Sequence, residues 1–186
     1  ATSAFFQRHP LLPKPTVLGA TGFTVSAVGF GAYRIHEHEP DHREALKVAL
    51  TSGVNLIDTS TNYTDGSSEK LIGDVIQELV GQGRIQRSEI VVVTKVGYVQ
   101  GTNLREARAL KERGTGFPDM VEYHADCWHN ISPEYLEDQI TRSLTRLKLE
   151  TIDVLLLHNP EYFLKTVSNR EIYYARIKKA FEYLEG

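Results

Sequence analysis

The segment Val54-Asn55-Leu56-Ile57-Asp58 is a short apolar stretch that ends in a carboxylate. Two later segments have the same form, because residues 90–94 lead into Lys95 and residues 152–157 lead into His158. A helical pattern follows each segment, so the alternation predicts parallel strands joined by helices. In a (β/α) barrel the carboxyl ends of the strands converge on one mouth, where polar residues build the active site. The sequence therefore predicts an α/β fold of the barrel type with a site at its strand ends.

Size and composition narrow the class of protein. The chain has 186 residues and 41% hydrophobic content, which is enough for one domain with a buried core. Its 21 basic and 24 acidic residues give a net charge of −3 and are spread along the chain, which argues against nucleic-acid and membrane-surface partners. The single cysteine, Cys127, excludes an intrachain disulfide and suits a reducing compartment. No apolar run approaches the roughly 20 residues of a membrane span, and residues 1–15 lack the order of a signal peptide, so we expect a soluble cytoplasmic protein.

The hydrophobic pattern predicts the order of the strands. An irregular arm is expected over residues 1–16, with Phe5 and Phe6 packed on the body, and a hairpin over residues 17–26 turns at Thr21-Gly22. Strands are then expected at 27–33, 54–58, 90–96 and 152–158. The last of these is almost entirely apolar, which is typical of a strand covered on both faces. Residues 97–131 follow no period, so they predict a long functional or mobile loop, an insertion at about 98–131.

Four helices are expected between and after these strands. Asp41 with Glu44 has the capping-box spacing, and so has Ser168 with Glu171, whereas Ser132-Pro133 has the order of a cap followed by proline. The helices that follow the last three strands have apolar faces. The residues of these faces are Leu71, Ile72, Val75, Ile76, Leu79 and Val80, then Leu136, Ile140, Leu144 and Leu147, and finally Ile172, Ile177, Phe181 and Leu184.

Four strand–helix units are too few to close a barrel of eight strands. We therefore expect only the hairpin and the first four units of a TIM (β/α)8 barrel, over residues 17–186. The open edge of such a half would expose an unpaired strand and apolar surface. We expect the remainder of the barrel to come from a missing C-terminal half rather than from a second chain.

The strand-end residues predict a type of chemistry. A lysine such as Lys95 at the end of a buried strand needs a carboxylate beside it, and Asp58 on the neighbouring strand is the candidate. An ammonium group favours the ionised form of a nearby phenol, so Tyr63, five residues after Asp58, is a candidate to exchange a proton with a carbonyl or alcohol. His158 is placed to orient the same oxygen. Since no serine or cysteine has an evident base partner, the reaction that fits is hydride transfer at a carbonyl, with the hydride supplied by a cofactor.

A set of motifs resembles the N-terminal half of the aldo-keto reductase family over nearly all of residues 17–186. The motifs are Leu18-Gly19, Thr21-Gly22, Val25-Ser26, Gly29-Phe30-Gly31, the run 53–60 with Tyr63, Ser68-Glu69 with Gly73, Thr94-Lys95-Val96-Gly97 and Leu156-Leu157-His158-Asn159-Pro160. Within the family the chain resembles the sugar and pyridoxal dehydrogenase branch more than the aldose reductases. It implies a catalytic tetrad in which Tyr63 is the general acid, Asp58 and Lys95 tune it, and His158 orients the substrate.

The resemblance also implies a nicotinamide cofactor, NADP or NAD, and a small carbonyl or alcohol substrate. Cofactor-binding residues would be Gly31, Ala32, Tyr33, Arg34, Asp58 and Asn159, and substrate-binding residues would be His158 and Trp128. The family's amide-binding serine-asparagine pair, its ring-stacking tyrosine and its adenosine-phosphate residues belong to the second half of the barrel. Ser168-Asn169 is not that pair, because no strand precedes it.

Other interpretations stay open. A single aspartate or histidine at a strand end is more often structural, although all four residues in this order favour a site. Trp128 is either a lid over the substrate or a hydrophobic anchor. Two groups have the residue types of metal ligands but no complete set, so no metal is expected: His36, His38 and His42, and then His124, Cys127 and His129. The alternatives to a reductase are a non-catalytic cofactor-binding or regulatory protein of the same fold, a metal-dependent lyase that uses Asp58 and His158 as ligands, or an inactive fragment.

Overall fold

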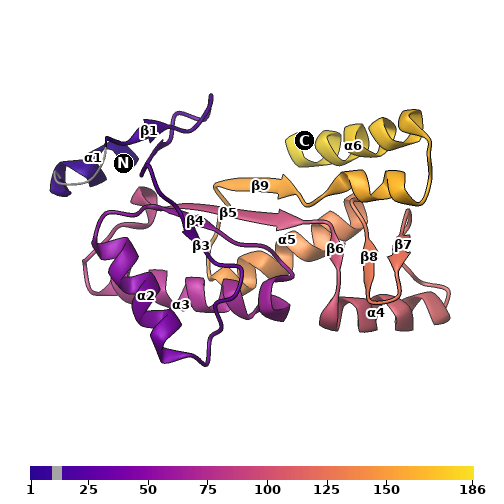
Figure 1. Cartoon of the computed structure of the whole chain (residues 1–186), viewed down its shortest axis with the longest axis horizontal. Helices are drawn as coiled ribbons and strands as arrows, with labels where there is room; N and C mark the ends of the chain where they lie inside the picture. Colours follow the sequence, from indigo (N-terminus) through magenta and orange to yellow (C-terminus); the bar gives the residue numbers. More distant parts are fainter. Residues whose placement is uncertain (10–13) are drawn as a thin grey trace. The chain divides into compact units, whose positions relative to one another are not determined.

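The computed structural model of the protein describes residues 1–9 and 14–186 (Figure 1). These residues form two compact units, the first made of residues 1–94 and 144–155, the second of residues 95–143 and 156–186. The main sheet has the strand order β3-β4-β5-β9. Among residues 1–9 and 14–186, no helix is both long enough and apolar enough to cross a bilayer.

The first unit contains the predicted hairpin and the start of the parallel sheet. Strands β1 (Thr16–Val17) and β2 (Thr24–Val25) pair antiparallel, and the turn between them includes Gly22 at φ 75°, which confirms the hairpin. Strands β3 (Phe30–Gly31), β4 (Leu56–Asp58) and β5 (Val91–Val96) then pair in parallel. The strands are shorter than predicted, but their order and direction are as expected.

Helices α2 (Pro40–Thr51) and α3 (Ser67–Gly81) lie side by side against this sheet. The prediction that Asp41 caps α2 is wrong, because the helix begins at Pro40 with Glu39 at the cap position. Proline suits the first turn of a helix, since it has no N–H to leave unpaired. The predicted apolar face of α3 is buried with the exception of Val80, which is 36% exposed.

The core of the first unit brings α2, α3 and the strands together with the N-terminal arm. Its members include Leu46 and Leu50 of α2, Ile57 of β4 and Val92 of β5. Residues 2–8 of the arm are helical rather than irregular, as α1 (Thr2–Phe5) and η1 (Phe6–Arg8). Burial of Phe5 explains this order, because a fully buried aromatic ring contributes roughly 1.5–3 kcal/mol. Residues 10–13 of the predicted arm lie outside the described residues, and the boundary at residue 17 stays a prediction.

The second unit shows that the region expected to be an aperiodic loop is folded. Helix α4 (Gly101–Glu112) follows the short strand β6 (Tyr98–Val99), and β7 (Val121–His124) and β8 (Cys127–His129) complete an antiparallel sheet in the order β6-β8-β7. The prediction of a long loop is therefore wrong. Strands of two to four residues are too short to carry a readable period, and α4 buries only Leu104 and Ala107.

The last elements depart from the predicted burial. Helix α5 (Pro133–Leu147) starts at the expected proline, and β9 (Val154–Leu157), η4 (Pro160–Lys165) and α6 (Arg170–Glu185) follow it. The expectation that β9 is covered on both faces is wrong, because none of its four residues is fully buried and Leu156 is 42% exposed. The open edge itself is confirmed. The predicted cap Ser168 is also wrong, since the Asn169 side chain accepts the hydrogen bond from the Ile172 N–H.

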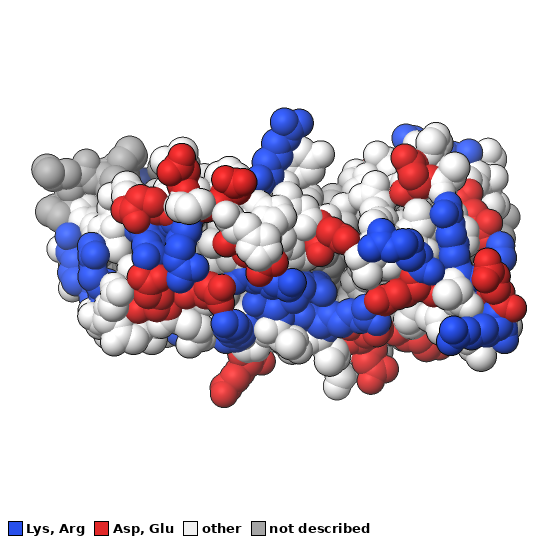
Figure 2. Space-filling model, turned by 90° about the horizontal axis from the view of Figure 1, so that it is seen from below, with Lys and Arg blue, Asp and Glu red and all other residues white. Residues whose placement is uncertain are grey.

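The predicted apolar face of α6 is only partly buried. Within the described chain, Ile172 and Phe181 of its predicted apolar face are each 47% exposed, and Ala180 is the residue that the helix buries. Basic and acidic side chains are interspersed on the face of the molecule shown in Figure 2.

Candidate functional site

Asp58 is the last residue of β4, and the sheet register fixes its backbone. It lies opposite Gly31 of β3 and Val93 of β5. The Asp58 carbonyl accepts a hydrogen bond from the Ala32 N–H at 2.8 Å, and the next residue, Thr59, donates to the Val93 carbonyl at 2.8 Å. The half-buried Asp58 therefore stands at the carboxyl end of β4, as the sequence predicts, beside the end of β3 and the middle of β5.

Tyr63 begins the short turn η2 (Tyr63–Gly66), which leaves the same strand end. Its ring meets the edge of Tyr33, with 5.0 Å between centroids and an interplanar angle of 82°. The next two residues, Thr64 and Asp65, have φ values of 46° and 56°, a left-handed conformation that is uncommon for residues other than glycine. Such backbone is retained where the surrounding structure holds it, often at functional sites. Here the Thr64 hydroxyl helps by donating to the Ile35 carbonyl at 2.8 Å.

A buried polar network lies at the start of α3, directly after the Tyr63 turn. The carboxylate of Glu69 is fully buried, accepts a hydrogen bond from the Thr94 hydroxyl at 2.6 Å, and pairs with Arg146 Nε at 2.7 Å. Ser68 donates to the Ala32 carbonyl at 2.9 Å. The sequence analysis identified Ser68-Glu69 as part of a motif but did not predict that these side chains form a buried hydrogen-bond network. The signal in the sequence was the run of polar residues 67–70 at the start of a helix that is otherwise apolar.

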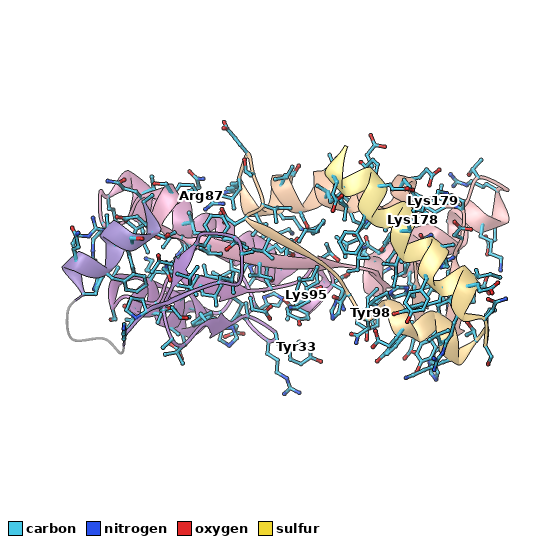
Figure 3. All side chains as sticks on the ribbon, turned by 90° about the horizontal axis from the view of Figure 1, so that it is seen from above. Tyr33, Arg87, Lys95, Tyr98, Lys178 and Lys179 are labelled. Atoms are coloured by element: carbon cyan, nitrogen blue, oxygen red, sulfur yellow. The ribbon has the colours of Figure 1, made fainter. Side chains whose placement is uncertain are left out.

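The end of β3 presents an open surface in the first unit. Tyr33 is 62% exposed and projects from the ribbon in Figure 3, and the Arg34 guanidinium lies 5.7 Å from the centre of its ring. A Cβ added at Gly31 would have no atom within 4 Å. An exposed aromatic ring, a cation and a nearby carboxylate are groups that suit a planar ring attached to a ribose. Gly31, Tyr33 and Arg34 of the predicted cofactor-binding residues are thus exposed here, whereas Ala32 is buried.

The other two predicted catalytic residues belong to the second unit. Lys95 is half-buried in β5, one residue before its end. His158 follows β9, and its N–H donates to the Val96 carbonyl at 2.7 Å. The His158 ring packs against Tyr98, with 4.3 Å between centroids. The structure thus places Asp58 and Tyr63 in one unit, and Lys95 and His158 in the other.

Tyr98 and Asn159 form a polar pair beside His158. The Tyr98 hydroxyl donates to Asn159 Oδ1 at 3.1 Å, and Asn159 has a left-handed φ of 47°. Burial, together with a hydrogen bond to Tyr162, raises the pKa of Tyr98 above its ordinary value. This phenol therefore stays protonated and bound to Asn159, which makes it a poor proton donor for a reaction.

Trp128 lies in β8 with 7% exposure. The cations of Arg108 and Lys111 on α4 lie 5.6 and 5.5 Å from its ring. The indole also lines a cavity of about 180 Å³ with Phe117 and Met120. In this unit Trp128 anchors β8 to α4, as one of its two predicted roles requires, and its contact with substrate stays a prediction.

The histidine groups considered for metal binding make local hydrogen bonds. The His42 ring accepts from the His36 N–H at 3.0 Å, and the His36 ring accepts from the His38 N–H at 3.2 Å. His124 pairs with Asp126 at 2.5 Å. Among residues 1–9 and 14–186 the structure contains no group of three or more His, Cys, Asp or Glu side chains that could hold a metal ion.

Comparison with known proteins gives a consistent result. Residues 27–186 match the model of the Aldo/keto reductase family. The chain is 28% identical over 153 residues to an NADH-specific methylglyoxal reductase of Escherichia coli, covering 78% of this chain and 41% of that protein. It is 30% identical over 148 residues to a putative voltage-gated potassium channel subunit beta of Schizosaccharomyces pombe, covering 77% and 36%. It thus spans about two fifths of the length of these relatives.

A solved structure agrees with the sequence matches. An aldo-keto reductase from Bacillus halodurans in its holo form superimposes with a TM-score of 0.58 at 27% identity, covering 78% of this chain and 40% of that one. The parallel strand order β3-β4-β5-β9 is what a segment of a (β/α)8 barrel contains.

Proposed function

Because the chain belongs to the aldo/keto reductase family, we propose that the protein transfers a hydride between a nicotinamide cofactor and the carbonyl or alcohol of a small aldehyde, ketone or sugar. One observation in the first unit carries this proposal. The register of β3 and β4 places Gly31 opposite Asp58, so the exposed Tyr33 and the Tyr63 turn leave neighbouring strand ends. A carboxylate and a phenol thus stand beside a surface that is open to a planar ring.

The cofactor-binding residues in this proposal are Gly31, Ala32, Tyr33, Arg34, Asp58 and Asn159. When bound, NADH or NADPH supplies the hydride that the carbonyl carbon receives. The exposed ring of Tyr33 offers an apolar face, and the Asp58 carboxylate offers acceptors for ribose hydroxyls. Which of the two dinucleotides binds is left to experiment.

Tyr63 is the proposed general acid. Its hydroxyl gives a proton to the carbonyl oxygen while the carbon gains the hydride, so the carbonyl becomes an alcohol and the reverse reaction returns both. We propose that Asp58 and Lys95 act on the phenol and that His158 orients the substrate oxygen. The packing of Tyr63 against Tyr33 supports this role, because a general acid must be held in one place.

A binding or regulatory protein of the same fold is the second candidate. It is favoured by the match to a protein named as a potassium channel subunit beta. The two candidates differ in turnover, since both would bind a dinucleotide.

The buried free thiol of Cys127 fits the expected cytoplasmic location, which stays a prediction.

The test uses the natural full-length protein with NADH and NADPH, and with methylglyoxal and small sugars as probes. We expect carbonyl-dependent oxidation of the cofactor, and we expect Tyr63→Phe to reduce kcat by about 10²–10⁴-fold while cofactor affinity is kept. Tyr174→Phe on the exposed side of α6 is the matched control and should keep full activity. Cofactor binding without turnover in the unmodified protein would instead favour the binding protein, and turnover that requires a metal ion would favour a lyase.

A further inference from the structure

His129 is a buried histidine that the proposed chemistry does not use. It ends β8 in the second unit and has no exposed surface. Its Nε2 lies 2.7 Å from the carbonyl oxygen of His158. A carbonyl can only accept a hydrogen bond, so Nε2 must carry the hydrogen and donate. Among the described residues Nδ1 has no hydrogen-bond partner.

Gly97 lies directly against this hydrogen bond. A Cβ added at Gly97 would lie 2.6 Å from the His158 carbonyl oxygen and 2.7 Å from His129 Nε2. Gly97 has a φ of 156° and accepts a hydrogen bond from the Asn130 N–H at 2.9 Å. The glycine therefore lets β8 approach residue 158 closely enough for the bond to form.

His158 is then fixed on both sides of its peptide backbone. Its N–H is bound by the Val96 carbonyl at 2.7 Å, and its carbonyl is bound by His129. The next residue, Asn159, has the left-handed φ of 47°, so the chain turns sharply directly after the histidine. The His129 bond holds the peptide at the point where the turn begins.

We propose that His129 is a positioning residue for His158, holding the His158 peptide so that its imidazole keeps one orientation toward the substrate oxygen. This inference rests on the proposed function, in which His158 orients the carbonyl. A packing role alone explains the presence of a histidine at this position less well. A buried imidazole with one unpaired nitrogen carries a desolvation cost that an apolar side chain of similar size would avoid.

The charge state of His129 agrees with this role. Burial lowers the pKa of His129 to about 4, the Arg176 cation lowers it further, and the bond to the His158 carbonyl and the Glu161 carboxylate oppose the shift. The ring is therefore neutral near neutral pH, with one donor for the carbonyl. A protonated ring would place a second N–H at Nδ1, where the described residues provide no acceptor.

Two pairs of variants of the full-length protein test the proposal. His129→Phe keeps a ring but removes the donor, and we expect kcat to fall by up to about 10²-fold with cofactor affinity unchanged, since small displacements of a reacting group have effects of this size. His129→Gln places an amide N–H near the position of Nε2 and should restore most of kcat. His129→Asn has a shorter side chain and should not. His124→Phe, at an exposed side chain of β7, is the control and should match the unmodified protein.

A second measurement does not depend on turnover. In protein labelled with nitrogen-15 at histidine, the His158 ring signals should shift in His129→Phe and return in His129→Gln. Unchanged His158 signals and unchanged kcat in His129→Phe would overturn the proposal, and so would equal losses in the Phe and Gln variants. If His129→Phe does not fold, the comparison of Gln with Asn decides in the same way. Failure of the unmodified protein to turn over any carbonyl would refute the proposed function, while the ring signals would still report whether His129 positions His158.

Discussion

The burial of His129 predicts a specific dependence of stability on pH. The folded pKa of about 4 lies below the ordinary value of 6.5, because burial disfavours the charged ring. In the unfolded chain the same histidine takes up a proton near its ordinary pKa. Between these two pKa values the unfolded state binds a proton that the folded state does not. The unfolding free energy is therefore unaffected by His129 above about pH 6.5, and it falls progressively as the pH is lowered toward 4.

The size of the effect follows from the same two values. At about 1.4 kcal/mol per pH unit, the interval between 6.5 and about 4 corresponds to about 3.5 kcal/mol of unfolding free energy. The effect is large, because the whole unfolding free energy of a folded domain is typically roughly 5–15 kcal/mol. His129→Gln has no titrating ring, so it should be less sensitive to acid than the unmodified protein by about this amount.

Urea unfolding at pH values from about 7 to about 4.5 measures this difference. Trp128 is the single tryptophan of the chain and is buried one residue before His129, so its fluorescence reports the unfolding of the second unit. The quantity of interest is the loss of unfolding free energy with pH in the unmodified protein minus the loss in His129→Gln. His38→Gln, at a side chain that is 78% exposed, is the control and should keep the unmodified slope. Equal pH slopes for the unmodified protein and His129→Gln would refute the reasoning.

Three further predictions concern the stability of the first unit, each measured as the urea midpoint against the unmodified protein. Arg146→Met removes the cationic partner of the fully buried Glu69 carboxylate and should lower the unfolding free energy by about 3–5 kcal/mol. Addition of Glu69→Gln should recover part of this loss, and no recovery in the double variant would contradict the role of the pair. Gly73→Ala places a Cβ 2.5 Å from the Leu147 carbonyl oxygen and should cost about 1–3 kcal/mol despite the better helix propensity of alanine, so an increase in stability would be the contrary result. Asn55→Ala deletes a side chain with no exposed surface that makes three hydrogen bonds to the backbone, and it should cost about 1–3 kcal/mol or more; a change within about 0.5 kcal/mol would show that those groups find other partners.

The sequence was most informative where a pattern is long or local. The run that ends at Asp58 predicted a parallel strand with a carboxylate at its carboxyl end, and the register with Gly31 and Val93 confirms that position. The hairpin was predicted equally well, because Gly22 at positive φ fits a tight turn. Both signals act over a few residues and need no knowledge of distant contacts.

Burial and short strands were not predictable in the same way. In an apolar run Leu156 is expected to be a core residue, yet its exposure depends on what packs over its face of the sheet, which the run does not encode. The strands β6, β7 and β8 are too short for a period, so their region was expected to be a loop. Tertiary pairing, which no local pattern reports, builds that sheet.

The candidate site shows the same division. The strand-end positions of Asp58, Lys95 and His158 could be predicted, because strand ends follow from the pattern of each segment. The sequence analysis missed the supporting roles of Glu69 and His129, because these roles depend on contacts with Arg146 and with the His158 carbonyl, which lie 77 and 29 residues away in sequence. For Glu69 the one local signal was its place among polar residues at the start of an apolar helix. Polar residues that become buried leave little trace in a single sequence.

The central claim is that the protein moves a hydride from a nicotinamide cofactor to a carbonyl carbon while Tyr63 supplies the proton. Reduction of a carbonyl with cofactor that carries deuterium in place of the transferred hydride tests this claim most directly, with the full-length protein and mass analysis of the alcohol. We predict one deuterium on the carbinol carbon of the product, formed much more slowly by Tyr63→Phe. An alcohol without deuterium, or label transfer that is just as fast in Tyr63→Phe, would contradict the account.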